Sequence, residues 1–219
     1  MISLILPCMR QSAREVLSDL ATQTIRPDLV RIIDNDDVFI HDQPHFFPTF
    51  PFRIEYVNPG ENIGTNAAWN QAWCLADHAQ YVGVIGDDYR INKRCIEHML
   101  LYLRDEVAVT CAIVKGNTVP QRTKPLVGQY VRAKGRLGFA LFHGDYLKEL
   151  PLIPKEFKIF FGDNWIEYWL AYMKWPLCQI NTPISHEHKT DLKEKLDYPT
   201  VISSERINWK CWLRGVKEL

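Results

Sequence analysis

The chain has 219 residues, a length that suits one large domain. Hydrophobic residues make up 47% and charged residues 24%, a composition typical of globular proteins that excludes a disordered or fibrous chain. Lysine plus arginine and aspartate plus glutamate both number 26, so the net charge is zero. Any site for a polyanion must therefore be a local patch rather than the whole surface.

The six cysteines are scattered with no C-x-x-C pair, which argues against a zinc site or a disulfide scaffold and predicts reduced thiols, most of them in the core. The first apolar run ends at Pro7 with no basic residue before it, so we expect no signal peptide. No stretch approaches the roughly 18–20 apolar residues that cross a bilayer. We therefore expect a soluble cytoplasmic protein without a transmembrane segment.

Strands and helices alternate along the first half of the chain. Short apolar runs predict strands, and apolar residues three and four positions apart predict helices. The predicted strands are 2–6, 29–33, 53–57, 81–85 and 107–114, and the predicted helices are 12–22, 65–79 and a third from Asn92, as its cap, to about residue 104. This order predicts an α/β fold whose central sheet is mostly parallel and flanked by helices. In such sheets ligands bind at the carboxyl ends of the strands.

The second half is less regular. We expect strands at 138–142 and 178–181, a short helix at 145–150 and a strongly aromatic helix at 163–174. The connection 39–52 holds five phenylalanines and three prolines, so we expect it to pack against the body as a flap. His143 is interpreted as a structural residue.

Asp87 and Asp88 follow the apolar strand 81–85. Two neighbouring carboxylates repel each other unless a positive charge lies beside them. Mg²⁺ or Mn²⁺ is the usual partner, because these ions prefer carboxylate oxygens and share their other positions with substrate phosphates. The alternative is a capping turn whose carboxylates are solvated.

An asparagine-rich segment precedes that strand. Gly60 and Gly64 permit a tight turn into the next helix. Asn62, Asn66 and Asn70 are four residues apart, which places their amides on one helix face. Amides in this position either bind ribose and phosphate or tie down neighbouring loops.

The pattern N-x-G-x-N-A-A-x-N, followed by a strand and Asp-Asp, resembles the nucleotide-sugar half of family 2 glycosyltransferases of the GT-A (Rossmann-like) fold. The resemblance implies that Pro7 closes the first strand and that Asp34, or Asp36 in the same acidic cluster, contacts the nucleotide base. It also implies donor contacts from a further set of residues, namely Pro7, Asn62, Gly64, Asn66, Asn70 and Asp87.

Two later blocks are similar to the same family, so the resemblance covers residues 2 to about 190. Phe-Phe-Gly-Asp163-Asn-Trp resembles the block Phe-x-Glu-Asp, whose aspartate is the catalytic base. His186 and His188 lie in a segment that resembles the late histidine motif, which completes the metal and diphosphate site. The aromatic residues of 163–174 are most simply core residues, and Trp165, close to Asp163, is also a candidate for lining a sugar face.

The resemblance implies a metal-dependent glycosyltransferase that moves a sugar from a nucleoside-diphosphate sugar, with a UDP-sugar favoured, to an acceptor hydroxyl. Asp87 and Asp88 would hold Mn²⁺ or Mg²⁺ on the diphosphate, and Asp163 would take the acceptor proton, which implies inversion at the anomeric carbon. The acceptor would be a glycan, a lipid-linked saccharide or a nucleic acid. The oligomeric state is left open.

We expect one domain over 1–219, with a nucleotide-sugar half (1–114), an acceptor and catalytic half (115–190) and a C-terminal segment (191–219). The segment 115–137 contains six basic residues and no acidic one. It is interpreted as a solvated loop, as a lid over the donor diphosphate, or as a docking site for a polyanionic acceptor.

Three other functions are considered. A degenerate domain that binds a sugar nucleotide without turnover is suggested by Gly86 and Gly162, which stand where the family carries acidic residues. A nucleotidyltransferase would have a glycine-rich turn and an arginine directly after the first strand, whereas here the turn is Pro-Cys-Met-Arg-Gln-Ser. A dinucleotide oxidoreductase would need G-x-G-x-x-G at that point, which is absent. We also expect the chain to lack the membrane-associating extension of many relatives.

Overall fold

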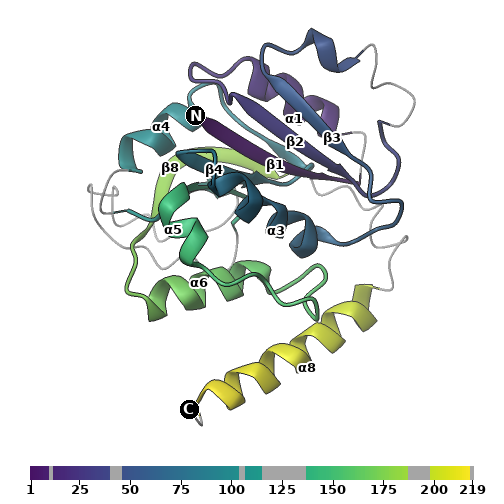
Figure 1. Ribbon diagram of the computed structural model, residues 1–219, viewed down its shortest axis with the longest axis vertical. Coiled ribbons are helices and arrows are strands. Elements are labelled where there is room, and N and C mark those ends of the chain that lie inside the picture. Colours follow the sequence, from purple (N-terminus) through teal and green to yellow (C-terminus); the bar gives the residue numbers. More distant parts are fainter. Residues whose placement is uncertain (10–11, 40–45, 104–106, 115–136, 187–197, 218–219) are drawn as a thin grey trace.

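The computed structural model describes residues 1–9, 12–39, 46–103, 107–114, 137–186 and 198–217 (Figure 1). Within them one sheet has the strand order β3-β2-β1-β4-β7-β6-β8-β5. The strands are β1 (Ile2–Cys8), β2 (Leu29–Asp34), β3 (Arg53–Val57), β4 (Tyr81–Ile85), β5 (Tyr89–Arg90), β6 (Val109–Val114), β7 (Phe139–His143) and β8 (Leu177–His186). The helices are α1 (Ala13–Ala21), α3 (Thr65–Ala76), α4 (Cys95–Tyr102), α5 (Gly144–Glu149), α6 (Gly162–Tyr172) and α8 (Tyr198–Lys217), with a 3-10 turn, η1, at Phe47–Thr49.

Strands β3, β2, β1 and β4 are parallel, as the alternation of strands and helices predicts. Strand β7 runs antiparallel between β4 and β6, while β6 and β8 are again parallel. The α/β fold with a mostly parallel central sheet is thus confirmed. The reversal at β7 falls where the alternating pattern has ended, so periodicity carried no information about its direction.

The hydrophobic core lies on both faces of the sheet. One face packs against α3, α5 and α6, with Ala72, Leu147 and Ile166 in its cluster. The other face packs against α1 and α4, with Leu17 and Met99 in its cluster. Burying apolar side chains on both faces is what the short apolar runs of the strands require.

Three boundaries differ from those expected. Pro7 does not close β1, because the strand continues to Cys8; the β1–β4 ladder already ends at Ile5 and Val84, so that side offers no ladder bond for the proline to lose. Helix α4 begins at Cys95 rather than beside Asn92, because the Asn92 side chain accepts the Arg94 N–H in a turn instead. Strand β8 is longer than expected, since it continues to His186.

The expected packing of the phenylalanine-rich connection is confirmed for the residues that the structure describes. Phe39 is fully buried and its ring lies 5.8 Å from that of Phe46 and 5.4 Å from that of Phe47. The Arg14 guanidinium lies 4.9 Å from the Phe39 ring centroid, a cation–π contact that joins this segment to α1.

Helix α8 was not expected from the sequence. It lies beneath α6 and the loop that precedes α6 (Figure 1). Its Glu205 is buried, and Trp209 and Trp212, four and seven residues further on, contact the core cluster. These spacings place all three side chains on one face of the helix. None of the helices in the described part of the chain is long and apolar enough to span a membrane.

The cysteines allow a test of this packing. Cys74 and Cys211 are exposed, whereas burial raises the pKa of the Cys95 and Cys111 thiols to about 12. Because the thiolate is the reactive form, these buried thiols should not react with Ellman's reagent at pH 8 until the protein is unfolded. We expect the variant C74S/C211S to lose the fast phase of labelling. Fast labelling of Cys95 in that variant, located by mass spectrometry, would contradict the fold.

Candidate functional site

The carboxyl ends of β1 and β4 meet at one edge of the sheet. Met9 directly follows β1, and Asp87 lies two residues after the end of β4. The Met9 N–H donates a hydrogen bond to Asp87 Oδ2 at 2.7 Å. Asp87 is 6% exposed, whereas Asp88 is half-buried. The structure therefore places the predicted acidic pair at the sheet edge where ligands of α/β proteins bind.

The Asp34 carboxylate is engaged within the chain. It accepts hydrogen bonds from the Val38 N–H at 2.9 Å, the Phe39 N–H at 2.8 Å and the Tyr56 hydroxyl at 2.9 Å. Burial and, to a smaller degree, the Asp34 carboxylate raise the pKa of Tyr56 to about 12, so the phenol remains a donor. Asp36 is exposed two residues further on. Asp34 thus holds the loop, and Asp36 is the more accessible of the two predicted base contacts.

Asn35, between these two aspartates, was not singled out from the sequence. It is 7% exposed, its N–H donates to the Cys8 carbonyl at 2.8 Å, and its side-chain oxygen accepts the Ile63 N–H at 3.4 Å. Its side-chain nitrogen has no hydrogen-bond partner within the described residues. An unsatisfied buried donor is costly, so Asn35 Nδ2 is a candidate for contacting a ligand at this edge. The only sequence signal was an amide within an acidic cluster.

The predicted tight turn before α3 is confirmed. Gly64 adopts φ +82°, and a Cβ there would lie 2.4 Å from the Lys158 carbonyl oxygen, so only glycine fits. The side-chain oxygen of Asn62 accepts the Gly64 N–H at 2.9 Å, and its nitrogen lies 3.8 Å from the sulfur of Met9. Asn62 therefore lies beside the end of β1, as a donor contact would require.

Asn66 and Asn70 use their amides to tie down a neighbouring loop. Asn66 Nδ2 donates to the carbonyls of Phe157 and Phe160, at 2.8 and 2.9 Å. Asn70 exchanges two 2.9 Å hydrogen bonds with the backbone of Ile153. The sequence left two roles open for these amides, binding of ribose and phosphate or attachment of a neighbouring loop. These contacts describe loop attachment. Asn70 also lines a cavity of about 290 Å³ together with Asn62.

Asp163 lies in the first turn of α6. Phe161, which precedes the helix, adopts the left-handed region at φ 62°, and Asp163 Oδ1 accepts the Asn164 N–H at 2.9 Å. Asp163 is half-buried and lines a cavity of about 360 Å³. Apart from Asp163, the polar side chains of this lining belong to Thr65, Asn66, Asn164 and Arg206.

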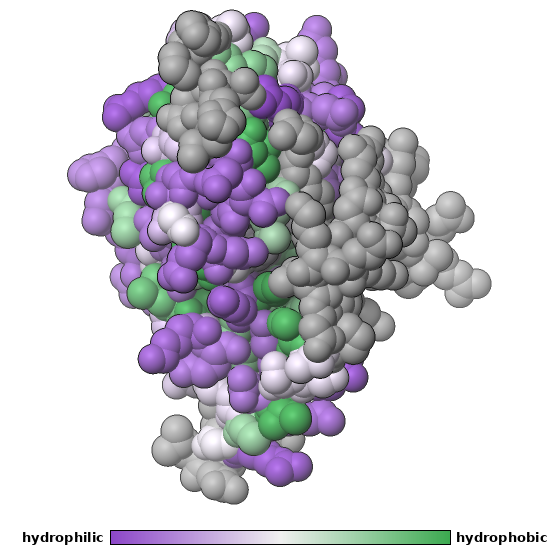
Figure 2. All heavy atoms as spheres, turned by 90° about the vertical axis from the view of Figure 1, so that its right-hand side faces the viewer, coloured by the Kyte–Doolittle hydropathy of each residue, from purple (hydrophilic) through white to green (hydrophobic). Residues whose placement is uncertain are grey.

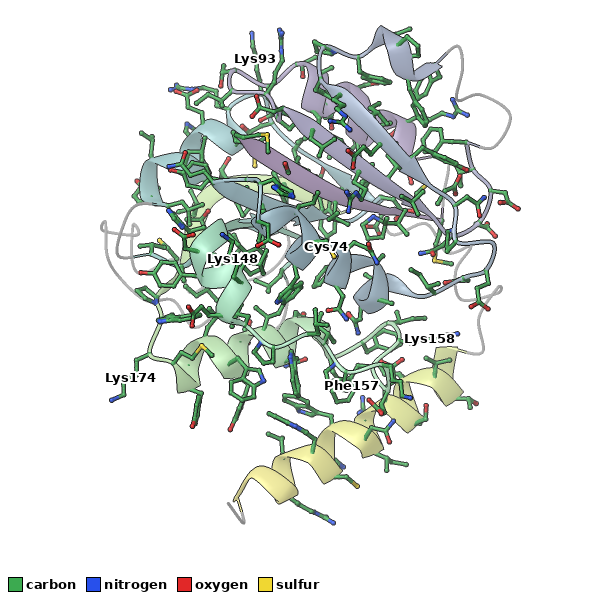
Figure 3. The ribbon with its side chains drawn as sticks, viewed as in Figure 1. Cys74, Lys93, Lys148, Phe157, Lys158 and Lys174 are labelled. Carbon is green, nitrogen blue, oxygen red and sulfur yellow. The ribbon has the colours of Figure 1, made fainter. Side chains whose placement is uncertain are left out.

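Glu205 of α8 fixes the loop before Asp163. Its carboxylate accepts the N–H groups of Lys158 at 3.1 Å, Ile159 at 3.1 Å and Phe160 at 2.7 Å. Phe157 and Lys158 lie on the part of this loop that faces α8 (Figure 3). Burial raises the pKa of the Glu205 carboxyl, while the three backbone donors oppose that effect. The cluster of hydrogen bonds makes α8 part of the support for Asp163.

Steric crowding explains why glycine stands at the two positions, 86 and 162, where the family carries acidic residues. A Cβ at Gly162 would lie 2.0 Å from the Asn66 side-chain oxygen, so Asn66 occupies the space of a longer side chain. A Cβ at Gly86 would lie 2.9 Å from the Tyr89 ring. Packing accounts for both glycines, which were the only sequence features that favoured a degenerate domain.

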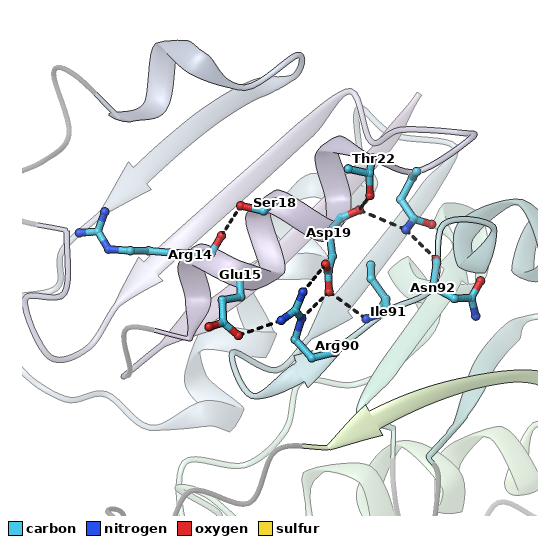
Figure 4. A network of polar contacts seen from close by, with 9 residues as sticks. Arg14, Glu15, Ser18, Asp19, Thr22, Arg90, Ile91 and Asn92 are labelled. Atoms are coloured by element: carbon cyan, nitrogen blue, oxygen red, sulfur yellow. Dashed lines mark hydrogen bonds and ion pairs between the residues drawn. The ribbon is translucent and has the colours of Figure 1, made fainter.

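A polar network anchors the chain just after Asp88. The Arg90 guanidinium pairs with both Asp19 oxygens, at 2.7 Å each, and with Glu15 at 3.0 Å. The Ile91 N–H also donates to Asp19 (Figure 4). Strand β5 is thereby held against α1, which fixes the turn that carries Asp88.

Of the two histidines predicted to complete the metal and diphosphate site, only His186 lies within the described residues. The backbone of His186 pairs with that of Tyr89, so the end of β8 lies opposite the residue that follows Asp88. His188 lies outside the described residues, as does the basic segment up to residue 136. Within the described part of the chain no three metal-ligating side chains form a cluster.

Trp165 is a core residue, which is the simpler of the two roles that the sequence left open, and it does not line a sugar face. It is 6% exposed, its indole N–H donates to the Pro151 carbonyl, and its ring lies 4.6 Å from that of Trp212. The contact with α8, which the sequence did not reveal, buries it. His143 is structural as expected, since its ring nitrogen accepts the Asp145 N–H at the start of α5.

Residues 10–166 match the family model described as glycosyl transferase family 2. A search of the curated proteins found no match.

Several solved structures share the fold. S. aureus TarS 1–349 in complex with UDP is 17% identical, with a TM-score of 0.59, over 86% of this chain and 58% of that chain. The same TarS fragment with UDP-GlcNAc is 15% identical, with a TM-score of 0.59, over 86% and 56%. GalNAc-T7 with UDP, GalNAc and Mn²⁺ is 13% identical, with a TM-score of 0.67, over 86% and 43%. The chain thus spans less than two thirds of each of these structures.

The network after Asp88 gives a stability prediction. Asp19→Ala removes the acceptor of the Arg90 guanidinium and the Ile91 N–H, so the free energy of unfolding should fall by about 1–2 kcal/mol. Urea denaturation measures this loss. Arg53→Ala is the control, because Arg53 is 73% exposed and its ion pair with Glu55 should contribute little. An unchanged urea midpoint for Asp19→Ala would contradict the anchoring role.

Proposed function

The chain belongs to glycosyl transferase family 2, and on this basis we propose that it transfers a sugar from a UDP-sugar to an acceptor hydroxyl with inversion. The observation that carries the proposal is the sheet edge where Asp87 and Asp88 adjoin the end of β1. UDP and UDP-GlcNAc in the TarS structures, and UDP in that of GalNAc-T7, support the choice of nucleotide.

The donor would bind across the ends of β1, β2 and β4. Asn62 and Asn35, whose side-chain nitrogen has no partner among the described residues, offer amide groups there, and exposed Asp36 is proposed for a base or ribose contact. Asp34 acts by shaping the loop that presents Asn35 and Asp36, since its carboxylate is bonded to the backbone of that loop.

Asp87 and Asp88 fit a Mn²⁺ or Mg²⁺ ion that is shared with the donor. Mg²⁺ is usually held by one or two carboxylates plus substrate phosphates, and Asp87 and Asp88 supply two neighbouring carboxylates. When bound, the ion would supply Lewis-acid stabilisation of the charge on the leaving diphosphate. His186 and His188 are proposed as further ligands of the ion or the diphosphate. Because Asp87 also accepts the Met9 N–H, it orients the acidic pair against β1.

Asp163 is proposed as the base. It lines the 360 Å³ cavity, whose apolar wall includes Trp69 and Phe160, and its carboxylate would accept the proton of the attacking hydroxyl. A base opposite the leaving group supports direct displacement and therefore inversion. The acceptor is proposed to be a glycan, a lipid-linked saccharide or a nucleic acid.

Donor binding is tested by thermal unfolding with UDP, with and without Mn²⁺. A ligand at one hundred times its Kd should stabilise the folded state by about 2.7 kcal/mol. We expect this stabilisation only with Mn²⁺ and expect Asp88→Asn to lose it. Asp77→Asn, at the far end of α3, is the matched control and should behave as the parent protein. Equal stabilisation of Asp88→Asn would show that the acidic pair does not hold the ion.

The base is tested with Asp163→Asn. Asparagine retains an oxygen that accepts the Asn164 N–H, so the helix start should persist while proton transfer is lost. We expect kcat for UDP release to fall by about 10²–10⁴-fold with UDP binding unchanged. Asp145→Asn, which alters an exposed carboxylate on α5, should leave the rate unaltered. Full turnover in Asp163→Asn would refute the assignment.

A further inference from the structure

Helix α8 contributes directly to the cavity that contains Asp163. Ile202 and Arg206, one turn apart on α8, line this cavity, and Asp163 lines it from the start of α6. Figures 1 and 3 show α8 below α6 and below the loop that leads into it. The cavity is therefore completed by a helix that lies outside the matched family region, 10–166.

Arg206 is a cation without an ion-pair partner among the described residues. It is exposed, and the carboxylate beside it in the sequence, Glu205, is buried and bonded to the backbone of Lys158, Ile159 and Phe160. Glu205 thus faces the loop while Arg206 faces the cavity. Because a guanidinium is always charged and its planar donors match the geometry of carboxylate and phosphate, Arg206 in this position is suited to an anion brought by a ligand.

The lining of the cavity is that of a small-molecule site. Apolar side chains, among them Trp69 and Ile202, form one part of the lining, and polar side chains in equal number converge on the same space. Among the described residues of the lining, Asp163 and Arg206 are the two ionisable ones, so they present one carboxylate and one guanidinium to the cavity. A ligand that contacts both residues would offer a hydroxyl group to Asp163 and a negatively charged group to Arg206.

The position of Arg206 is fixed by its neighbours on α8. Glu205 binds three backbone N–H groups, and Trp209 stacks on Phe161 with ring centroids 6.0 Å apart. Trp212 lies 4.6 Å from Trp165. A helix attached at these points presents Arg206 from a rigid element, as a specificity contact requires.

We propose that Arg206 selects an acceptor that carries an anionic group, a carboxylate or phosphate, near its attacking hydroxyl. This inference rests on the proposed function, in which Asp163 is the base. Arg206 would pair with the anion by charge-assisted hydrogen bonds and would thereby hold the hydroxyl next to Asp163.

The test compares two sugars that differ in one charge. Methyl β-glucuronide and methyl β-glucoside are titrated at constant ionic strength, and binding is followed by tryptophan fluorescence, because Trp69 lines the cavity. We expect the glucuronide to bind about tenfold more tightly, the effect of one hydrogen-bonded charge pair, and inorganic phosphate to compete with it.

The variant Arg206→Gln should abolish the preference, and Arg206→Lys should restore part of it. Lys210→Gln is the matched control, since Lys210 is exposed one turn further along α8 and does not line the cavity. Equal binding of the two sugars by the parent protein, or a preference that survives in Arg206→Gln, would overturn the inference.

Thermal unfolding with UDP and Mn²⁺ separates this inference from the proposed function. We expect Arg206→Gln to bind UDP as the parent protein does. If its affinity for UDP falls instead, Arg206 serves the donor diphosphate and the acceptor inference fails while the proposed function stands. If the parent protein binds no nucleotide, the proposed function fails, and the comparison of the two sugars still decides the role of Arg206.

Discussion

The candidate site depends on one irregular stretch of backbone, residues 157–161, which is held from two sides. Asn66 of α3 donates to its carbonyls, and Glu205 of α8 accepts from its N–H groups. Backbone polar groups outside helices and strands need such partners. The two side chains thereby set the left-handed turn at Phe161 and the start of α6. The placement of Asp163 is thus determined by residues far from it in the sequence.

The parts of the fold that could be predicted are those determined by local patterns. Apolar runs located β1 to β4, and the spacing of apolar residues located α1 and α3, because burial on one or both faces imposes these periods. The turn at Gly64 and the acidic pair were also accessible, since a positive φ and paired carboxylates each restrict the residue type. The phenylalanine-rich connection was predicted to pack down because exposing five rings to water is unfavourable.

The parts that were missed depend on contacts between distant segments. Helix α8 has a mixed sequence whose apolar face is recognisable only against α6. Of the two roles left open for Trp165, the contact with α8 decides for the core. Asn35 looks like one polar residue among several. That its side-chain nitrogen has no partner in the described part of the chain becomes evident only once β1 and β2 are paired. Asn66 has the residue type of a ligand contact, but the loop that it binds begins ninety-one residues later.

The pairing of β5 with β8 has a consequence for the order of assembly during synthesis. Tyr89 and Arg90 pair with His186 and Ser185, which leave the ribosome only after almost all of the remaining sheet. A nascent chain is able to form the β1–β4 sheet early, because its contacts are closer in sequence. At that stage the turn that carries Asp87 and Asp88 is anchored to α1, but β5 does not yet have β8 as its neighbouring strand. Completion of the acidic site thus coincides with completion of the sheet, so an unfinished chain would not yet possess it.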